Sequence, residues 1–238
     1  MDASASAQPA TTRFPRVGGT IHTVVILVVL AGWALFAKIM TAHQSTAANH
    51  SPVRPYLITI LLEWFIFAVT LAGVHHYGAP LRTVLGDRWR SAGRLFRDIG
   101  IALAFWLVSQ GVLYVVGRLL HVVQDPKMAA MFPHGGIQIA LWIALSVTAA
   151  ICEETVFRGY LQTQFMALTK NAPAGILLSA AAFGAAHAYQ GFRMTILIAV
   201  FGAMFGILAH WRRSIRPGII AHAWQDSVSG IVAGLLQH

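Results

Sequence analysis

Acidic side chains are rare in this chain of 238 residues, and those that fall in apolar segments are the candidates for chemistry. There are 8 Asp and Glu residues in all, and Glu153, Glu154 and Asp226 lie in or beside apolar runs. A charge at the middle of a bilayer costs roughly 2.5–3.5 kcal/mol, so such residues usually have a function. The same reasoning applies to His187 and His222, which interrupt otherwise apolar segments.

The two adjacent glutamates begin the segment EETVFR, residues 153–158. On a helix Glu154 and Arg158 are four residues apart and lie one above the other, which favours a salt bridge. Glu153 is rotated by about 100° from Glu154 and is free to face a cavity. Because two neighbouring carboxylates in a low dielectric do not ionise together easily, Arg158 would hold Glu154 charged while Glu153 serves as a base. The alternative is a charged helix end at the membrane surface.

Two histidines on later segments could complete such a site. His187 follows a stretch rich in small residues, 179–186, and small residues let membrane helices approach closely. His222 and Asp226 are four residues apart on one helical face. The alternatives are an interfacial position for His187 and a hydrogen-bonded contact between helices for the second pair. Together with Glu153, these residues predict one water-filled pocket on which the side chains converge.

Other catalytic motifs are missing from the sequence. It contains no HExxH, no GxSxG and no GxxxxGK[ST], which excludes the common zinc-protease helix, the hydrolase nucleophile elbow and the phosphate-binding P-loop. The single cysteine, Cys152, excludes an internal disulfide framework and a cysteine-cluster metal site. Glu63 is a lone acid in an early apolar run, and we expect it to hydrogen-bond within the bundle without a catalytic role.

The composition indicates which kind of element carries these residues. Hydrophobic residues make up 57% of the chain and charged residues only 11%, far below the roughly 25% of soluble domains. Several apolar runs approach or reach the length at which a helix spans a bilayer. They cover 21–40, 57–74, 99–117, 137–152, 173–188, 194–211 and 217–236. We therefore predict an all-α fold, a polytopic transmembrane helix bundle with about seven to eight spans.

The chain after the fourth run is ambiguous. Residues 156–168 carry an apolar stripe at helical spacing, so they could continue that helix, lie at the interface or form an eighth span. The expected organisation is a cytoplasmic tail over 1–20, N-terminal membrane helices over 21–136 and a helical catalytic core over 137–238. The first segment is small and polar, which is typical of a disordered tail.

The distribution of basic residues predicts the orientation in the membrane. With the N-terminus inside, twelve of the 17 Lys and Arg residues face the cytoplasm and five face the other side. The twelve are Arg13, Arg16, Arg82, Arg88, Arg90, Arg94, Arg97, Arg158, Lys170, Arg212, Arg213 and Arg216. The five are Lys38, Arg54, Arg118, Lys127 and Arg193. The net charge of +9 therefore reflects topology, and because no nucleic-acid-binding motif accompanies it, nucleic acid is excluded as a partner.

Three motifs, in their order along the chain, resemble those of the CPBP family. This family comprises the CAAX-protease and bacteriocin-processing intramembrane proteases and is also called the Abi family. The three motifs are EExxxR at Glu153, Glu154 and Arg158, FxxxH at Phe183 and His187, and HxxxD at His222 and Asp226. The likeness covers roughly residues 137–236. Family members often carry Asn at the last position, so Asp226 is a departure that could make it a charged partner of His222 rather than a neutral donor.

The resemblance implies a multi-helix bundle with a polar cavity that opens toward the cytoplasm, and hydrolysis by a glutamate-activated water. The roles that it implies are general base (Glu153), support of that base (Glu154 and Arg158), partner in holding the water (His187) and oxyanion stabilisers (His222 and Asp226). No cofactor and no metal is expected. Zinc is the alternative, since two histidines and a carboxylate could hold it with a fourth position open.

Two functions of different classes follow. The first is an intramembrane endopeptidase, CAAX-processing-like, that hydrolyses a peptide bond at the membrane in a peptide or protein substrate, lipidated or not. The alternative is a non-catalytic membrane protein that binds a peptide or a bacteriocin in self-immunity. A proton-relay transporter would predict an internal repeat, which the sequence lacks. We expect an integral protein of the lipid bilayer, in a bacterial or archaeal plasma membrane, with its N-terminus in the cytoplasm.

Overall fold

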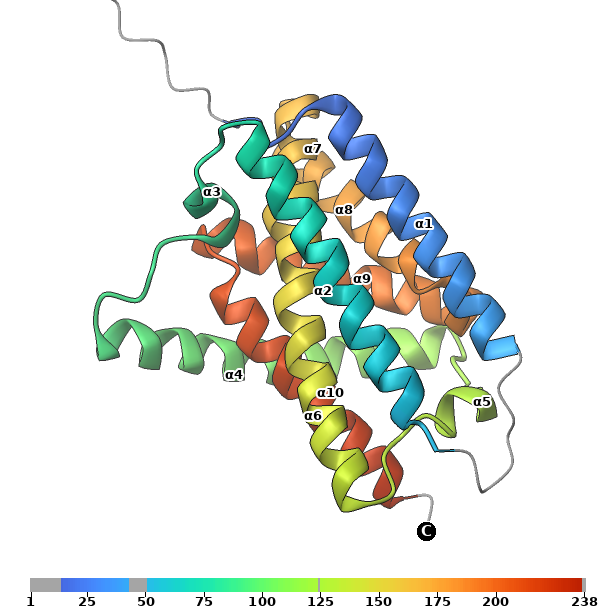
Figure 1. Ribbon diagram of the computed structural model, residues 1–238. Coiled ribbons are helices and arrows are strands. Elements are labelled where there is room, and N and C mark those ends of the chain that lie inside the picture. Colours follow the sequence, from blue (N-terminus) through green and yellow to red (C-terminus); the bar gives the residue numbers. More distant parts are fainter. Residues whose placement is uncertain (1–13, 43–50, 124, 237–238) are drawn as a thin grey trace, which may run out of the picture.

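Helices carry almost the whole chain in the computed structural model, which describes residues 14–42, 51–123 and 125–236. No strand occurs within these residues, so the predicted all-α fold is confirmed. The elements are α1 (Thr20–Ala42), α2 (Val53–His76), α3 (Leu81–Leu85), α4 (Ala92–Leu119), α5 (Pro126–Ala129), α6 (Gly136–Glu153), η1 (Glu154–Leu161), α7 (Gln162–Thr169), α8 (Ala172–Ala186), η2 (Ala188–Gln190), α9 (Phe192–Arg212) and α10 (Arg216–Leu235). The long helices form one bundle (Figure 1).

The lengths and outer surfaces of these helices fit a lipid bilayer. In the described part of the chain, five helical stretches are long and apolar enough to cross a membrane: α1, α2, α4, Gly136–Thr169 and α9. α8 is apolar but shorter. α10 has a suitable length but carries polar residues near its centre. Large apolar side chains such as Leu61, Leu107 and Ile207 are exposed on outer faces, where lipid rather than water would solvate them.

The fourth predicted span is longer than the sequence indicated. α6, η1 and α7 form one helical stretch of 34 residues, so residues 156–168 continue the fourth helix, which was one of the alternatives that the sequence left open. At 1.5 Å per residue this stretch is about 50 Å long, against roughly 30 Å for a bilayer core. Glu153 is the last of the 18 residues of α6 and lies near the middle of the stretch. The charged segment that begins at Glu153 is therefore not the end of a helix.

The middle of this long helix, η1, is wound as a π-helix, and every one of its residues is buried. Its apolar side chains, among them Phe157 and Tyr160, pack in a core with side chains of α1, α2 and α8. Gly159 allows α3 to approach, because a Cβ at that position would lie 2.7 Å from the backbone oxygen of Val84. π-Helical turns inside α-helices occur frequently at functional sites.

The residues immediately before α1 belong to the fold. Val17 is fully buried, and its N–H donates a hydrogen bond to Oε1 of Gln164 at 3.2 Å. Nε2 of the same glutamine donates to the backbone oxygen of Gly18 at 2.8 Å. Part of the segment predicted to be a disordered tail is thus held against α7, while residues 1–13 lie outside the described residues.

The two ends of the bundle differ in charge. We call "basic end" the end that holds the start of α1, α3, the α7–α8 turn and the α9–α10 turn (Figure 1). Here Arg212 Nη2 lies 3.2 Å from Asp98 Oδ1 and connects α9 to α4. At the opposite end Lys127 Nζ donates to the backbone oxygen of Ala42 at 3.0 Å and connects α5 to the end of α1. Of the twelve basic residues assigned to the first end, Arg13 lies outside the described residues and Arg158 is buried in the bundle, which leaves ten against five.

Candidate active site

Glu153 is the carboxylate around which residues of three helices meet. Nε2 of His187 lies 3.6 Å from its Oε1, and Nε2 of His222 lies 3.6 Å from its Oε2. Asp226 reaches the group through His222, with its Oδ2 at 3.3 Å from Nε2 of that ring. All four side chains line one cavity of about 580 Å³. α6, α8 and α10 therefore bring together the acidic and histidine residues that the sequence analysis selected.

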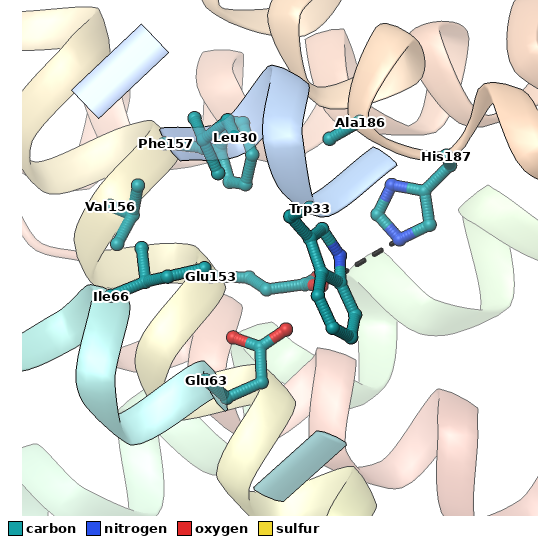
Figure 2. A pocket seen from close by; sticks show the side chains of 9 residues that line it. All are labelled: Leu30, Trp33, Glu63, Ile66, Glu153, Val156, Phe157, Ala186 and His187. Carbon is teal, nitrogen blue, oxygen red and sulfur yellow. Dashed lines mark ion pairs between the residues drawn. The ribbon is translucent and has the colours of Figure 1, made fainter. Parts of the chain in front are cut away.

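A small void lies against this carboxylate. It has a volume of about 10 Å³ and is bounded by Glu153, His187 and Glu63 together with apolar side chains (Figure 2). A void of this size holds about one water molecule, provided that polar groups surround it. Its three polar neighbours meet that condition.

The hydrogen bonds of His187 decide which of its nitrogens faces the void. Nδ1 lies 2.9 Å from the backbone oxygen of Phe183, and since a carbonyl only accepts, Nδ1 carries the proton. In the neutral ring Nε2 is then an acceptor, 3.6 Å from an oxygen of Glu153 that is an acceptor as well when ionised. A water molecule has two protons to donate, so it can hydrogen-bond to both acceptors at once. Neither acceptor has a proton to donate to the other.

The second glutamate makes the predicted pair with Arg158. Nη1 of Arg158 lies 3.0 Å from Oε1 of Glu154, and both side chains are buried. Nη2 also donates to the backbone oxygen of Gly202 on α9 at 3.3 Å. The guanidinium lies 4.2 Å from the ring centroid of Phe183 and 5.1 Å from that of Phe205. Phe183, conspicuous in the sequence only as part of FxxxH, is thus an aromatic neighbour of this cation.

His222 makes a contact that the sequence did not indicate. Its Nδ1 lies 3.1 Å from Oε1 of Glu154, so Glu154 forms an ion pair with Arg158 and a hydrogen bond with His222. Because an ionised carboxylate only accepts, Nδ1 is the donor in this bond. Nε2 faces Glu153 and Asp226, and it can donate to a carboxylate only in the doubly protonated imidazolium. This environment favours a cationic ring.

Glu63 of α2 is the residue of this site that sequence reasoning missed. It is 6% exposed, and it lines both the void and the larger cavity together with Glu153. Figure 2 shows its carboxyl directed toward that of Glu153, beside Trp33. The only signal in the sequence was the cost of an acid inside an apolar run, which does not identify a partner.

The donor atoms do not have the arrangement of a metal site. Within the described residues, no group of three or more His, Cys, Asp or Glu side chains could hold a metal ion. The two histidines approach different oxygens of Glu153, and Nδ1 of His222 is engaged by Glu154. A three-ligand zinc site needs nitrogen and oxygen atoms directed at one point, about 2.0–2.2 Å away.

The cavity extends from Glu153 toward the end of the bundle opposite the basic end. Its lining includes the last turns of α1 with Met40 and Thr41, the start of α2 with Pro55, and Met128 of α5. Apolar side chains dominate this part of the lining. A polypeptide with apolar residues would reach Glu153 from this side.

Comparison with known proteins supports the arrangement of motifs. Residues 134–228 match the model of the family described as type II CAAX prenyl endopeptidase Rce1-like. This segment is Rce1-like. The resemblance drawn from the three motifs is thereby confirmed, and the Rce1-like segment contains all of them. No curated protein and no solved structure matches the chain.

The match and the helices together define the class of protein. The Rce1-like family is a family of proteases, which supports an intramembrane peptidase at the level of the family. With five helices able to cross a bilayer in the described residues, the chain is an integral membrane protein. α1, α2 and α4 lie outside the Rce1-like segment, and α2 nevertheless contributes Glu63 to the lining of the site.

Proposed function

We propose that this protein is an intramembrane endopeptidase in which Glu153 activates a water molecule. The observation that supports this proposal is the void of about 10 Å³ bounded by Glu153, His187 and Glu63. It offers a water two acceptors, the Glu153 carboxylate and Nε2 of His187, at the inner end of a cavity that can admit a peptide. Hydrolysis in a bilayer requires this combination of a bound water, a base and an access path.

The reaction needs one proton to move twice. Glu153 takes a proton from the water as its oxygen attacks the peptide carbonyl carbon, which gives a tetrahedral oxyanion. When the C–N bond breaks, Glu153 returns the proton to the leaving nitrogen, and the products are a carboxylic acid and an amine. The base is therefore regenerated in each turnover.

The oxyanion would be stabilised by His222. Its Nε2 lies between Glu153 and Asp226, and as imidazolium it donates a charged hydrogen bond to the developing negative charge. Asp226 orients the ring and favours its cationic form. Glu154 and Arg158 act indirectly, through His222, because the hydrogen bond from Nδ1 of His222 to Glu154 fixes the plane of the ring. This chemistry uses no metal ion, and we propose a metal-free site.

The orientation in the membrane follows from the two ends of the bundle. With ten of the described basic residues at one end and five at the other, we propose that the basic end and the N-terminus face the cytoplasm. The cavity then opens toward the non-cytoplasmic face, because it extends to the opposite end. The family resemblance had implied a cytoplasmic opening, and both expectations cannot hold for this bundle.

A peptide-cleavage assay on the purified protein in liposomes tests the function. A library of fluorogenic apolar peptides, with and without a prenyl group, is offered to the wild type, to Glu153→Gln and to Asp87→Asn. We expect cleavage by the wild type and by Asp87→Asn, which makes the same carboxylate-to-amide change in an exposed loop. Glu153→Gln should lose at least a hundredfold in kcat because the base is gone. Full activity of Glu153→Gln would exclude the mechanism.

The same assay separates the peptidase from the non-catalytic binding protein. The cavity volume of about 580 Å³ suits a bound peptide as well as a reacting one. A binding protein would retain labelled peptides with equal affinity in the wild type and in Glu153→Gln, and would release them intact. Release of two fragments by the wild type alone identifies the peptidase.

A further inference from the structure

Glu63 is a buried acid that the proposed reaction does not yet use. It lies in the middle of α2, outside the Rce1-like segment 134–228, and only 6% of it is exposed. An acid in an apolar helix is costly, so its place beside the void calls for a physical explanation.

Glu63 shares its void with few polar side chains. The void that it borders is lined otherwise by Glu153, His187 and apolar or aromatic side chains such as Trp33 and Ile66. No Lys or Arg is among these lining residues. The imidazolium proposed for His222 already faces the carboxylates of Glu153 and Asp226, so it does not compensate a second charge on Glu63. The carboxyl groups of Glu63 and Glu153 border the same void, and that of Glu63 is directed toward that of Glu153 (Figure 2).

Two carboxyl groups in such contact can form a hydrogen bond only when they share a proton. Both ionised, they would repel each other in a medium of low dielectric constant, and neither has a proton to donate. With one proton between them, one group donates and the other accepts, as in other enzymes that use two carboxyl groups at one site. The two carboxyl groups then carry a single negative charge between them.

We infer that Glu63 is a positioning residue for the hydrolytic reaction, a carboxylic acid that donates its proton in a hydrogen bond to the Glu153 carboxylate. This inference rests on the proposed function for its catalytic consequence. The bond fixes the orientation of Glu153 toward the void. The pair holds one proton at rest and two after the water is deprotonated, and it returns to one when the leaving nitrogen takes a proton.

Infrared spectroscopy tests the shared proton without any turnover. Spectra of the purified protein in H₂O and D₂O at neutral pH are compared for the wild type, Glu63→Gln and Asp87→Asn. We expect a carboxylic-acid carbonyl band that shifts in D₂O, is lost in Glu63→Gln and is retained in Asp87→Asn. Absence of this band from the wild type, or its full retention in Glu63→Gln, would overturn the inference.

Kinetics then distinguish positioning from a structural role. An amide at position 63 can still donate to Glu153, so Glu63→Gln should keep kcat within about tenfold of the wild type. Glu63→Leu, which fills the same space but cannot donate, should lose roughly a hundredfold in kcat at unchanged KM. Wild-type kcat in a folded Glu63→Leu would overturn the inference, with folding checked by thermal unfolding. If no variant cleaves peptide but the infrared result holds, the carboxyl pair stands and the proposed function fails.

Discussion

His222 connects the two glutamates of the EExxxR motif through its two ring nitrogens. Nδ1 lies 3.1 Å from Oε1 of Glu154, while Nε2 lies 3.6 Å from Oε2 of Glu153. The ring from α10 therefore contacts both the glutamate paired with Arg158 and the glutamate beside the void. A substitution of Arg158 should therefore affect the side chains at the void through Glu154 and this ring, although Arg158 itself does not line the void.

We predict that Arg158→Met destabilises the protein by about 3–5 kcal/mol, because it leaves the charge of Glu154 buried with a weaker set of partners. The guanidinium and the carboxylate are 1% and 0% exposed, so solvent cannot replace the lost contact. The matched change Arg97→Met removes an arginine that is 55% exposed and should cost about 0.5 kcal/mol or less. Chemical unfolding in detergent micelles measures both. Equal losses in the two variants would contradict the importance of the buried pair.

We predict a second destabilisation from Gly202→Ala in α9. A Cβ at this position would lie 2.9 Å from Cδ1 of Phe183 and 3.4 Å from Nη2 of Arg158, so the ring or the helix must move. Crowding of this kind costs about 1–3 kcal/mol. Gly100→Ala in α4 is the control, because nothing lies within 4 Å of its Cβ and alanine favours a helix. Thermal unfolding should show a lower midpoint for Gly202→Ala and an unchanged or higher one for Gly100→Ala.

The local part of the site could be predicted from the sequence. A spacing of four residues places Glu154 beside Arg158 and His222 beside Asp226 on any helix, whatever the rest of the fold. The cost of charge in a membrane selected His187 as well. Most apolar runs located their helices within a few residues, as with 217–236 for α10, whereas the run 137–152 ended well before the helix that continues to Thr169.

The rest of the site depends on packing between helices that are distant in the sequence. Glu63 and Glu153 are brought together by α2 and the long central helix, and nothing near Glu63 in the sequence encodes that partner. The continuity of Gly136–Thr169 was ambiguous for a related reason. A segment with three charges resembles a helix end at the membrane surface, unless it is known that Glu154 lies beside both Arg158 and His222 inside the bundle.

We predict a graded response at Asp226. Its Oδ2 lies 3.3 Å from Nε2 of His222, and its side chain is 35% exposed to the cavity. Asp226→Asn keeps a polar group that can orient the ring or donate to the oxyanion, so kcat should fall by about tenfold or less. Asp226→Leu removes both abilities and should cost a hundredfold or more. Steady-state cleavage assays measure the two, and Ser229→Ala, one turn further along the same cavity wall, should stay within about twofold. A loss in Asp226→Asn as large as in Asp226→Leu would indicate that the charge of Asp226 is indispensable.

The last prediction concerns the side from which the cavity is reached. Cys152, the single cysteine, is buried, so Cys152→Ala gives a background without thiols for labelling. Arg88→Cys introduces a thiol in the loop before α4, and Phe192→Cys introduces one at the exposed start of α9, at the other end of the bundle.

In intact cells, a membrane-impermeant maleimide should label Phe192→Cys and should label Arg88→Cys only after the membrane is permeabilised, because basic loops remain in the cytoplasm. Since the cavity extends to the end at which Phe192 lies, this pattern would mean that substrates approach from the non-cytoplasmic side. The reverse pattern would place the basic end outside and restore the cytoplasmic opening that the family resemblance implied. Labelling of both sites in intact, unpermeabilised cells would mean that the two ends are not separated by the membrane, and it would contradict the bundle orientation itself.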